Sequence, residues 1–159
     1  MDLGGLKQAL SRLIALGSGL SQVEVLAAFP HGSALPLKGP SVFVSIDSLE
    51  LTPASLGGIA ASPAGEDAAI TVRFDFFSPG RGGPCLDELY EALCTVLLER
   101  GSGFGLRRIW SERTAWDDMA GSYRLSARAL LGGRARAGAG RKDAAGIEGF
   151  VLRAQAIDA

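Results

Sequence analysis

The chain has 159 residues, of which 47% are hydrophobic and 21% charged, so it has enough apolar material for a core and is not an intrinsically disordered chain. Its net charge of -1 argues against a surface coated with basic residues for nucleic acid. No apolar run approaches the roughly 18–20 residues of a membrane span, and no secretory signal pattern opens the chain. We therefore expect a soluble protein made in a cytoplasm, with no membrane partner.

Charge is distributed unevenly along the sequence. Residues 1–100 have 6 basic and 11 acidic side chains, whereas residues 101–142 have 9 basic and 3 acidic ones, a net charge of +6. Segregation of this kind can orient a subunit against its partners. It can equally follow from the order of the strands without any function, and both interpretations stay open at this level.

The first predicted element is an amphipathic helix from Met1 to Leu16. Leucine and isoleucine at spacings of three and four give it one apolar stripe, and Gly17 is a natural stop. The next segment, Leu20 to Ala28, is ambiguous between a short strand and a helical turn. Glycines and prolines between Pro30 and Pro40 then predict a loop.

Two strands follow, each with one apolar face. Ser41 to Leu51 alternates between apolar and polar residues, and Ala69 to Phe77 does so more strongly. The segment between them, Thr52 to Ala64, is rich in Gly, Ala, Ser and Pro, which predicts a long loop or hairpin connection.

A second helix is predicted from about Cys85 to Arg100. Pro84 suits its first turn, Asp87 and Glu88 favour the positive end of the helix dipole, and Gly101 ends it. Its apolar stripe consists of Leu86, Leu89, Tyr90, Leu93, Val96 and Leu97.

Two more strands, Phe104 to Ala115 and Ser122 to Leu131, are expected to be joined by a hairpin turn from Trp116 to Gly121. Residues 132–146 consist mostly of Gly, Ala and Arg without hydrophobic periodicity, which predicts a flexible linker. Phe150 to Ile157 is a candidate final strand after it.

These elements predict one α+β domain over residues 1–131, the linker over residues 132–146, and a C-terminal strand or arm over residues 147–159. The expected architecture is a mostly antiparallel sheet of four to five strands with two amphipathic helices packed on one face.

The sequence shows no pattern typical of catalysis. His31 is the only histidine and lies in a Pro/Gly-rich loop without a nucleophile elbow, which disfavours a catalytic triad or a site of several imidazoles. Cys85 and Cys94 fall on opposite faces of one helix, so we expect them neither to bond nor to share a metal. Two unpaired thiols fit a reducing compartment. We expect no catalytic residue, metal or cofactor, and no enzymatic activity.

Two glycine-rich segments and one acidic pair are candidate ligand sites. Pro79 to Pro84 lacks the Lys-Ser/Thr ending of a Walker loop, and Gly101 to Gly105 follows a helix where a dinucleotide fingerprint would follow a strand. Asp117 and Asp118 could hold a divalent cation with Glu112, but adjacent residues on a turn usually point apart. Turns are therefore the favoured interpretation of all three.

The predicted linker contains four cations, Arg134, Arg136, Arg141 and Lys142, which could contact nucleic acid phosphates. The same residues could instead form a solubilising hinge. The arm has no aromatic residue on which bases would stack, which weakens the first interpretation without removing it.

Three segments resemble the tail terminator and related minor tail proteins of tailed bacteriophages. They are Thr71–Gly80 (TVRFDFFSPG), Leu86–Leu93 (LDELYEAL) and Trp116–Leu130 (WDDMAGSYRLSARAL). The resemblance covers residues 1–131 and implies a virion protein, assembled in the host cytoplasm, that performs no catalysis. It implies a ring of identical subunits, commonly a hexamer, that caps the head-proximal end of the tail tube, stops tube polymerisation and joins the head connector.

On this interpretation the expected partners are other copies of the chain, the tail tube protein, the head connector or neck protein, and DNA in the lumen. The candidate interface residues are Arg107, Arg108, Arg113, Arg124, Arg128, Phe150 and Leu152. The basic side chains would face an acidic neighbour or the DNA path, and the terminal strand would add to a neighbouring sheet. The alternatives are another phage neck or tail-completion subunit, or a small nucleic-acid-binding module.

Overall fold

The computed structural model describes residues 3–30, 37–53, 66–79, 85–137 and 150–153. The predicted loop histidine, His31, lies outside the described residues, as do residues 80–84 of the glycine-rich loop and residues 138–149 of the predicted linker. Within the described residues, no helix has the length and apolar character needed to cross a membrane.

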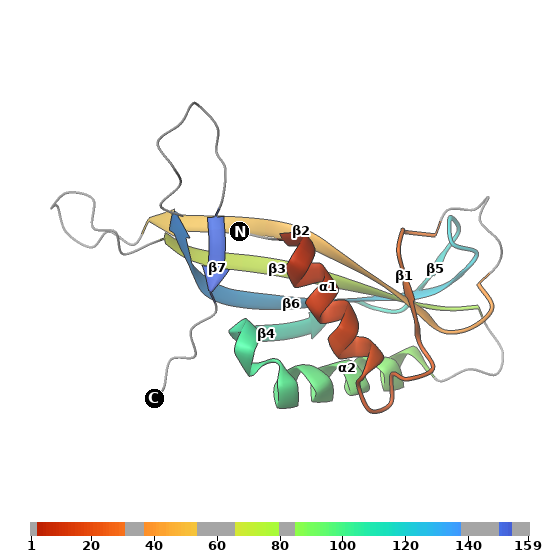
Figure 1. The fold of residues 1–159 in the computed structure, drawn as a ribbon. Helices are drawn as coiled ribbons and strands as arrows, with labels where there is room; N and C mark the ends of the chain where they lie inside the picture. Colours follow the sequence, from red (N-terminus) through yellow and green to blue (C-terminus); the bar gives the residue numbers. More distant parts are fainter. Residues whose placement is uncertain (1–2, 31–36, 54–65, 80–84, 138–149, 154–159) are drawn as a thin grey trace, which may run out of the picture.

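The described residues form two helices and a seven-stranded mixed sheet (Figure 1). The helices are α1 (Leu3–Ala15) and α2 (Leu86–Arg100), and a short 3₁₀ turn, η1 (Ser102–Phe104), follows α2. The strands are β1 (Glu24–Leu26), β2 (Ser41–Pro53), β3 (Glu66–Ser78), β4 (Leu106–Ser111), β5 (Ala115–Asp117), β6 (Ser122–Ala137) and β7 (Phe150–Arg153). The predicted α+β class is confirmed, with more strands than the four to five expected.

Three long strands, β2, β3 and β6, form the centre of the sheet, in the order β1-β2-β3-β6-β4. β1 is parallel to β2, and every other pairing is antiparallel. One side of β6 pairs with β3, and its other side pairs in succession with β5, β4 and β7. The two sides of the sheet are therefore unlike: β2 lies along one, and three short strands share the other.

Several predicted boundaries were wrong because pairing between distant segments decided them. The single strand expected from Phe104 to Ala115 is two strands, β4 and β5, separated by residues 112–114. β6 continues to Ala137 and so takes in the first six residues of the predicted linker, since their main chain pairs with β3 and β7 despite the lack of an apolar pattern. The ambiguous Leu20 to Ala28 contains β1.

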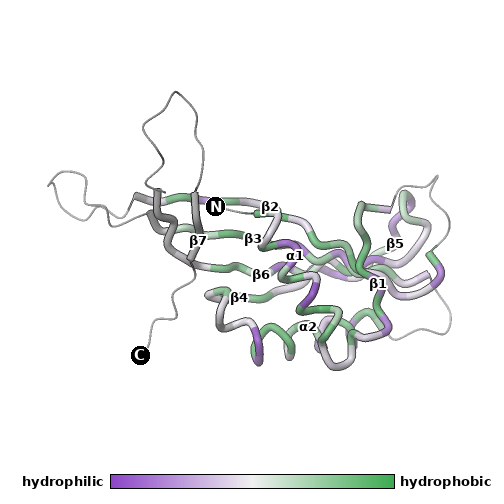
Figure 2. Tube along the Cα trace, viewed as in Figure 1, coloured by the Kyte–Doolittle hydropathy of each residue, from purple (hydrophilic) through white to green (hydrophobic). Residues whose placement is uncertain are grey.

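Helices α1 and α2 cover one face of the sheet, as predicted, and we call it the covered face (Figure 1). The apolar stripes of both helices and the inward side chains of β2, β3, β4 and β6 form one buried cluster. Phe74 and Phe76 of β3 are completely buried within it. The alternation of apolar and polar residues along β3 places these aromatic residues on the helix side. Figure 2 shows hydrophobic segments, in green, along the central strands.

A β-bulge at Asp47 changes which residues of β2 lie on the covered face of the sheet. Ile46 pairs with Val72, and the next paired residue, Ser48, lies opposite Thr71, so Asp47 is the extra residue. The even-numbered apolar pattern of β2 accordingly changes to the odd-numbered Leu49 and Leu51. The bulge keeps both halves of the strand apolar on the covered face.

Two glycines allow the chain to turn sharply from η1 into β4. Gly105 has φ +63°, and a Cβ there would collide with the carbonyl oxygen of Gly132. The Gly132 N–H donates to the Gly105 oxygen at 2.7 Å. A side chain at Gly132 would also collide with the guanidinium of Arg107, so glycine lets that cation lie across the strand.

Candidate interaction surfaces

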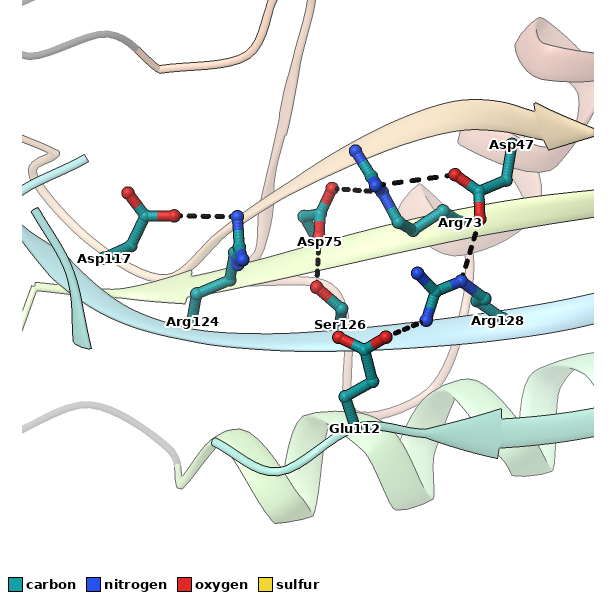
Figure 3. Close-up of polar contacts among 8 residues, drawn as sticks. All are labelled: Asp47, Arg73, Asp75, Glu112, Asp117, Arg124, Ser126 and Arg128. Carbon is teal, nitrogen blue, oxygen red and sulfur yellow. Dashed lines mark hydrogen bonds and ion pairs between the residues drawn. The ribbon is translucent and has the colours of Figure 1, made fainter. Parts of the chain in front are cut away.

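The sheet face opposite the helices, here called the open face, carries a network of ion pairs between distant strands (Figure 3). Asp47 of the β2 bulge accepts a hydrogen bond from Arg128 Nε at 2.8 Å and lies 3.4 Å from Arg73 Nη1. Arg128 also pairs with Glu112, which follows β4. Hydrogen bonds to Asp47 and then to Glu112 raise the pKa of Arg128. These contacts join β2, β3, β6 and the segment after β4.

Asp75 is the buried member of this network. Its side chain has no exposed surface, and it accepts hydrogen bonds from Arg73 Nε at 2.9 Å and from the Ser126 hydroxyl. A buried carboxylate needs such partners because burial without them would be costly. Asp75 therefore acts as an acceptor that holds β3 to β6.

A separate ion pair fixes the β5–β6 hairpin. Arg124 Nη1 lies 2.7 Å from Asp117 Oδ2, and the other oxygen of Asp117 accepts the N–H of Ala120 at 3.0 Å. Gly121, with φ +59°, completes the turn. Two of the three candidate cation ligands, Glu112 and Asp117, are thus paired with arginines. The described residues contain no cluster of three or more metal-ligating side chains.

These contacts divide the five arginines predicted as interface residues into paired and unpaired ones. Arg124 and Arg128 are paired within the chain, whereas Arg107, Arg108 and Arg113 are exposed and form no ion pair with a described residue. The guanidinium of Arg108 lies 5.0 Å from the ring centroid of Trp110. Among the predicted interface arginines, the exposed ones therefore lie along β4 and just after it, at one side of the sheet.

A pocket of about 280 Å³ lies between α2 and β4, beside these cations. We call it the α2–β4 pocket; it is lined by Tyr90, Cys94, Leu98, Leu106, Arg107, Arg108 and Ile109. Burial, and secondarily the neighbouring Cys94, raise the pKa of Tyr90, while a hydrogen bond with Ser111 acts in the opposite direction. The volume of the α2–β4 pocket is below the roughly 300–1,000 Å³ typical of small-molecule sites, so the pocket suits a protein side chain better than a cofactor.

The opposite side of the sheet presents an unpaired strand. β1 pairs only with Ser41–Phe43, and from Asp47 to Thr52 every residue of β2 is exposed and has no strand partner on its outer side within the described part of the chain. We call this stretch the β2 edge. Its Leu49 and Leu51 are exposed large hydrophobic residues, so it offers both main-chain hydrogen-bonding groups and apolar side chains.

The hairpin carries a third surface. Trp116, Met119 and Tyr123, here called the hairpin tip, are 53%, 59% and 49% exposed. Trp116 and Tyr123 are opposite each other across the strands, with ring centroids 5.2 Å apart in an edge-to-face arrangement. Trp116 thus lies on an exposed surface.

The predicted interface residues Phe150 and Leu152 lie on β7, whose main chain pairs with Arg134–Ala137 of the same chain. Their side chains are outside the described residues. Residues 154–157 of the predicted final strand also lie outside the described residues. Addition of this strand to a neighbouring sheet stays a prediction.

Sequence reasoning did not find the β2 edge or the α2–β4 pocket. A signal for the first was present: the apolar spacing changes at Asp47, which indicates that β2 continues through a bulge past Leu51. A signal for the second was Leu98, a leucine outside the apolar stripe of α2 and 70% exposed.

No family model matches the chain, and no curated protein matches it significantly. Among solved structures, it is similar to a chain of the virion of a native gene transfer agent particle, with a TM-score of 0.42 and 17% identity. The similarity covers 82% of this chain and 98% of that one.

Proposed function

We propose that this chain is a structural subunit of a phage-like virion that acts by assembly and catalyses no reaction. The observation that carries the proposal is the β2 edge, six exposed residues whose outer side has no strand partner within the described segments. Unpaired strands are ready templates for a strand from another chain, and proteins normally protect them. An edge with two exposed leucines favours a subunit that is completed by its neighbour.

The sheet also favours a ring. Its two sides differ, because β2 lies along one while β5, β4 and β7 share the other, next to the exposed arginines (Figure 1). A contact between unlike surfaces is head-to-tail, and such contacts close into rings when the rotation between subunits allows it. Together with the sequence resemblance, this supports a ring, as a hexamer, that caps the head-proximal end of a tail tube.

In this proposal the ring stops polymerisation of the tail tube protein and offers its other surface to the head connector or neck protein. The open face carries arginines that are paired with carboxylates, so it is a poor surface for phosphate. Among the predicted interface residues, Arg107, Arg108 and Arg113 are the ones free to contact DNA in the lumen, because they are exposed and form no ion pair with a described residue. A neck or tail-completion subunit of the same fold would use the same surfaces and differ in the ring on which it stacks.

The strand that occupies the β2 edge is proposed to be the C-terminal strand of a neighbouring copy, Phe150–Arg153 with the residues that follow. Deletion of residues 143–159 tests this proposal. We expect the truncated chain to lose ring formation while it keeps a cooperative unfolding transition. Rings that form as readily without these residues would show that another segment, or none, occupies the edge.

The edge itself is tested by the double variant Leu49→Lys/Leu51→Lys, because two charges along an edge strand oppose pairing with another chain. The control is Leu16→Lys, since Leu16 is 74% exposed and lies beyond the end of α1. We expect mass photometry and negative-stain images to show rings for the full chain and the control and single subunits for the double variant. A full chain that is monomeric at every concentration would contradict the proposed function.

The exposed arginines are tested by Arg107→Glu/Arg108→Glu. If these side chains face an acidic neighbour, charge reversal will weaken assembly most at low salt, where exposed charges are least screened. Equal assembly of this variant and the full chain at low and high salt would remove the two arginines from the interface.

A further inference from the structure

We infer that the hairpin tip of one copy docks in the α2–β4 pocket of the next copy. This inference rests on the proposed self-assembly and names a contact through which it would occur. It depends on two surfaces of the same chain that match in chemistry and that cannot meet within one subunit.

The hairpin tip is a preorganised apolar projection. Met119, the most exposed of its three side chains, lies in the turn between Asp117 and Gly121. The turn is held by the two contacts of Asp117, with Arg124 and with the N–H of Ala120, and by the edge-to-face contact of the aromatic pair. Because these contacts already fix the turn that presents Met119, docking need not order its backbone, which favours binding.

The α2–β4 pocket is a matching apolar depression. Tyr90, Cys94 and Leu98 follow one another at spacings of four along α2 and so form one line of the helix surface, facing Leu106 and Ile109 of β4. At about 280 Å³ the pocket can take a side chain of methionine size. Leu98 at its rim is 70% exposed, although it is an aliphatic residue.

The charges around the two surfaces are opposite. Arg107 and Arg108 line the pocket and form no ion pair with a described residue. Asp118 of the turn is exposed and is likewise in no ion pair with a described residue, whereas Asp117 is held by Arg124. A tip seated in the pocket would place the carboxylate of Asp118 near one or both guanidinium groups, which favours this occupant over a second tip or a basic partner.

The two surfaces are too far apart to meet in one copy. Ile109 of the pocket pairs with Ala129, and Trp116 of the tip pairs with Tyr123, six residues along the same strand β6. At roughly 3.4 Å per residue this separation is about 20 Å. Figure 1 shows β5 at the end of the sheet opposite to β7, beyond β4. The contact must therefore join different copies.

A disulfide between copies tests the contact, because Cys94 already lies in the pocket. The test uses the full chain with Cys85→Ser, so that Cys94 is the only native thiol, and adds Met119→Cys. Under a mild thiol oxidant we expect a ladder of linked copies on a non-reducing gel, and mass spectrometry should find the peptide around residue 119 joined to the peptide around Cys94. The matched control adds Leu16→Cys in the same background and should give no ladder.

Three results would overturn the inference. They are a Met119→Cys chain that links no more than the Leu16→Cys chain, a linked peptide that joins two copies of residue 119, and a linkage within one copy. Mass photometry of the same samples before oxidation separates this failure from failure of the proposed function. Rings without a 119–94 linkage would contradict the docking contact alone, and monomers would contradict both.

Charge exchange gives an independent measure of the same contact. Asp118→Arg and Arg108→Glu should each raise the concentration required for assembly at least tenfold. An equimolar mixture of the two variants should assemble at a lower concentration than either variant alone. The mixture recovers because an arginine tip meets a glutamate pocket between unlike copies. No recovery in the mixture would count against the pairing of these two residues.

Discussion

The two faces of the sheet are made by the same strands and yet are stabilised in different ways. The covered face buries Phe74 and Phe76 under two helices, and its stability comes from removal of apolar surface from water. The open face places its arginines against carboxylates of other strands (Figure 3), beside a small aromatic cluster in which Phe29 contacts Phe43 and the buried Phe77. Because those charges are already paired, we propose that partners bind at the periphery: the β2 edge, the α2–β4 pocket and the hairpin tip.

The largest change in the free energy of unfolding is expected for a substitution on the covered face. Phe74→Ala removes a completely buried ring from the core and should lower the free energy of unfolding by about 3–5 kcal/mol. Urea denaturation monitored by circular dichroism measures this change in the free energy of unfolding. Leu16→Ala, at an exposed position, is the control and should change the free energy by less than about 0.5 kcal/mol. Similar values for the two variants would contradict the assignment of the core.

A smaller effect is expected at the buried carboxylate of the open face. Asp75→Ala leaves the Ser126 hydroxyl and Arg73 Nε without their acceptor, which should cost about 1–3 kcal/mol in the same measurement. Asp75→Asn keeps an acceptor oxygen and should recover part of the loss. An Asp75→Ala chain as stable as the unchanged one would show that this contact does not hold β3 to β6.

The smallest effect is expected at the surface of the network. Asp47→Asn weakens ion pairs with Arg73 and Arg128 that are partly exposed, and should cost less than about 1 kcal/mol, with a larger loss at low salt than at high salt. Glu50→Gln is the matched control, since Glu50 lies on the same strand, is exposed and forms no ion pair with a described residue. Equal effects of the two substitutions would mean that the pairs of Asp47 contribute nothing measurable.

Local patterns in the sequence predicted the elements that bury a clear apolar face. The stripes of α1 and α2 and the alternation of β3 are contained within single segments, and the structure confirms both helices and their packing on one face. The glycine-rich end of β6 lacks such a pattern. It became a strand because β3 provides main-chain partners for it, and a single segment does not reveal its partners.

The surfaces proposed for assembly were only partly predictable for the same reason. Arginine is easily found in a sequence, but whether it is free depends on which carboxylate the fold brings near it. Arg128 meets Asp47, which is 81 residues away along the chain, whereas Arg107 and Arg108 meet no carboxylate in the described part of the chain. The tertiary arrangement therefore separated three exposed candidates from two paired ones.

Hydrogen–deuterium exchange of the full chain, compared between dilute and assembled samples, tests most directly that assembly uses the periphery. We predict that assembly slows exchange of the β2-edge amides that point away from β3, between Asp47 and Thr52, because a neighbouring strand would pair with them. The paired interior of β3 and β6 should show no added protection from such pairing. Assembly that leaves the exchange of residues 47–52 unchanged would contradict the account.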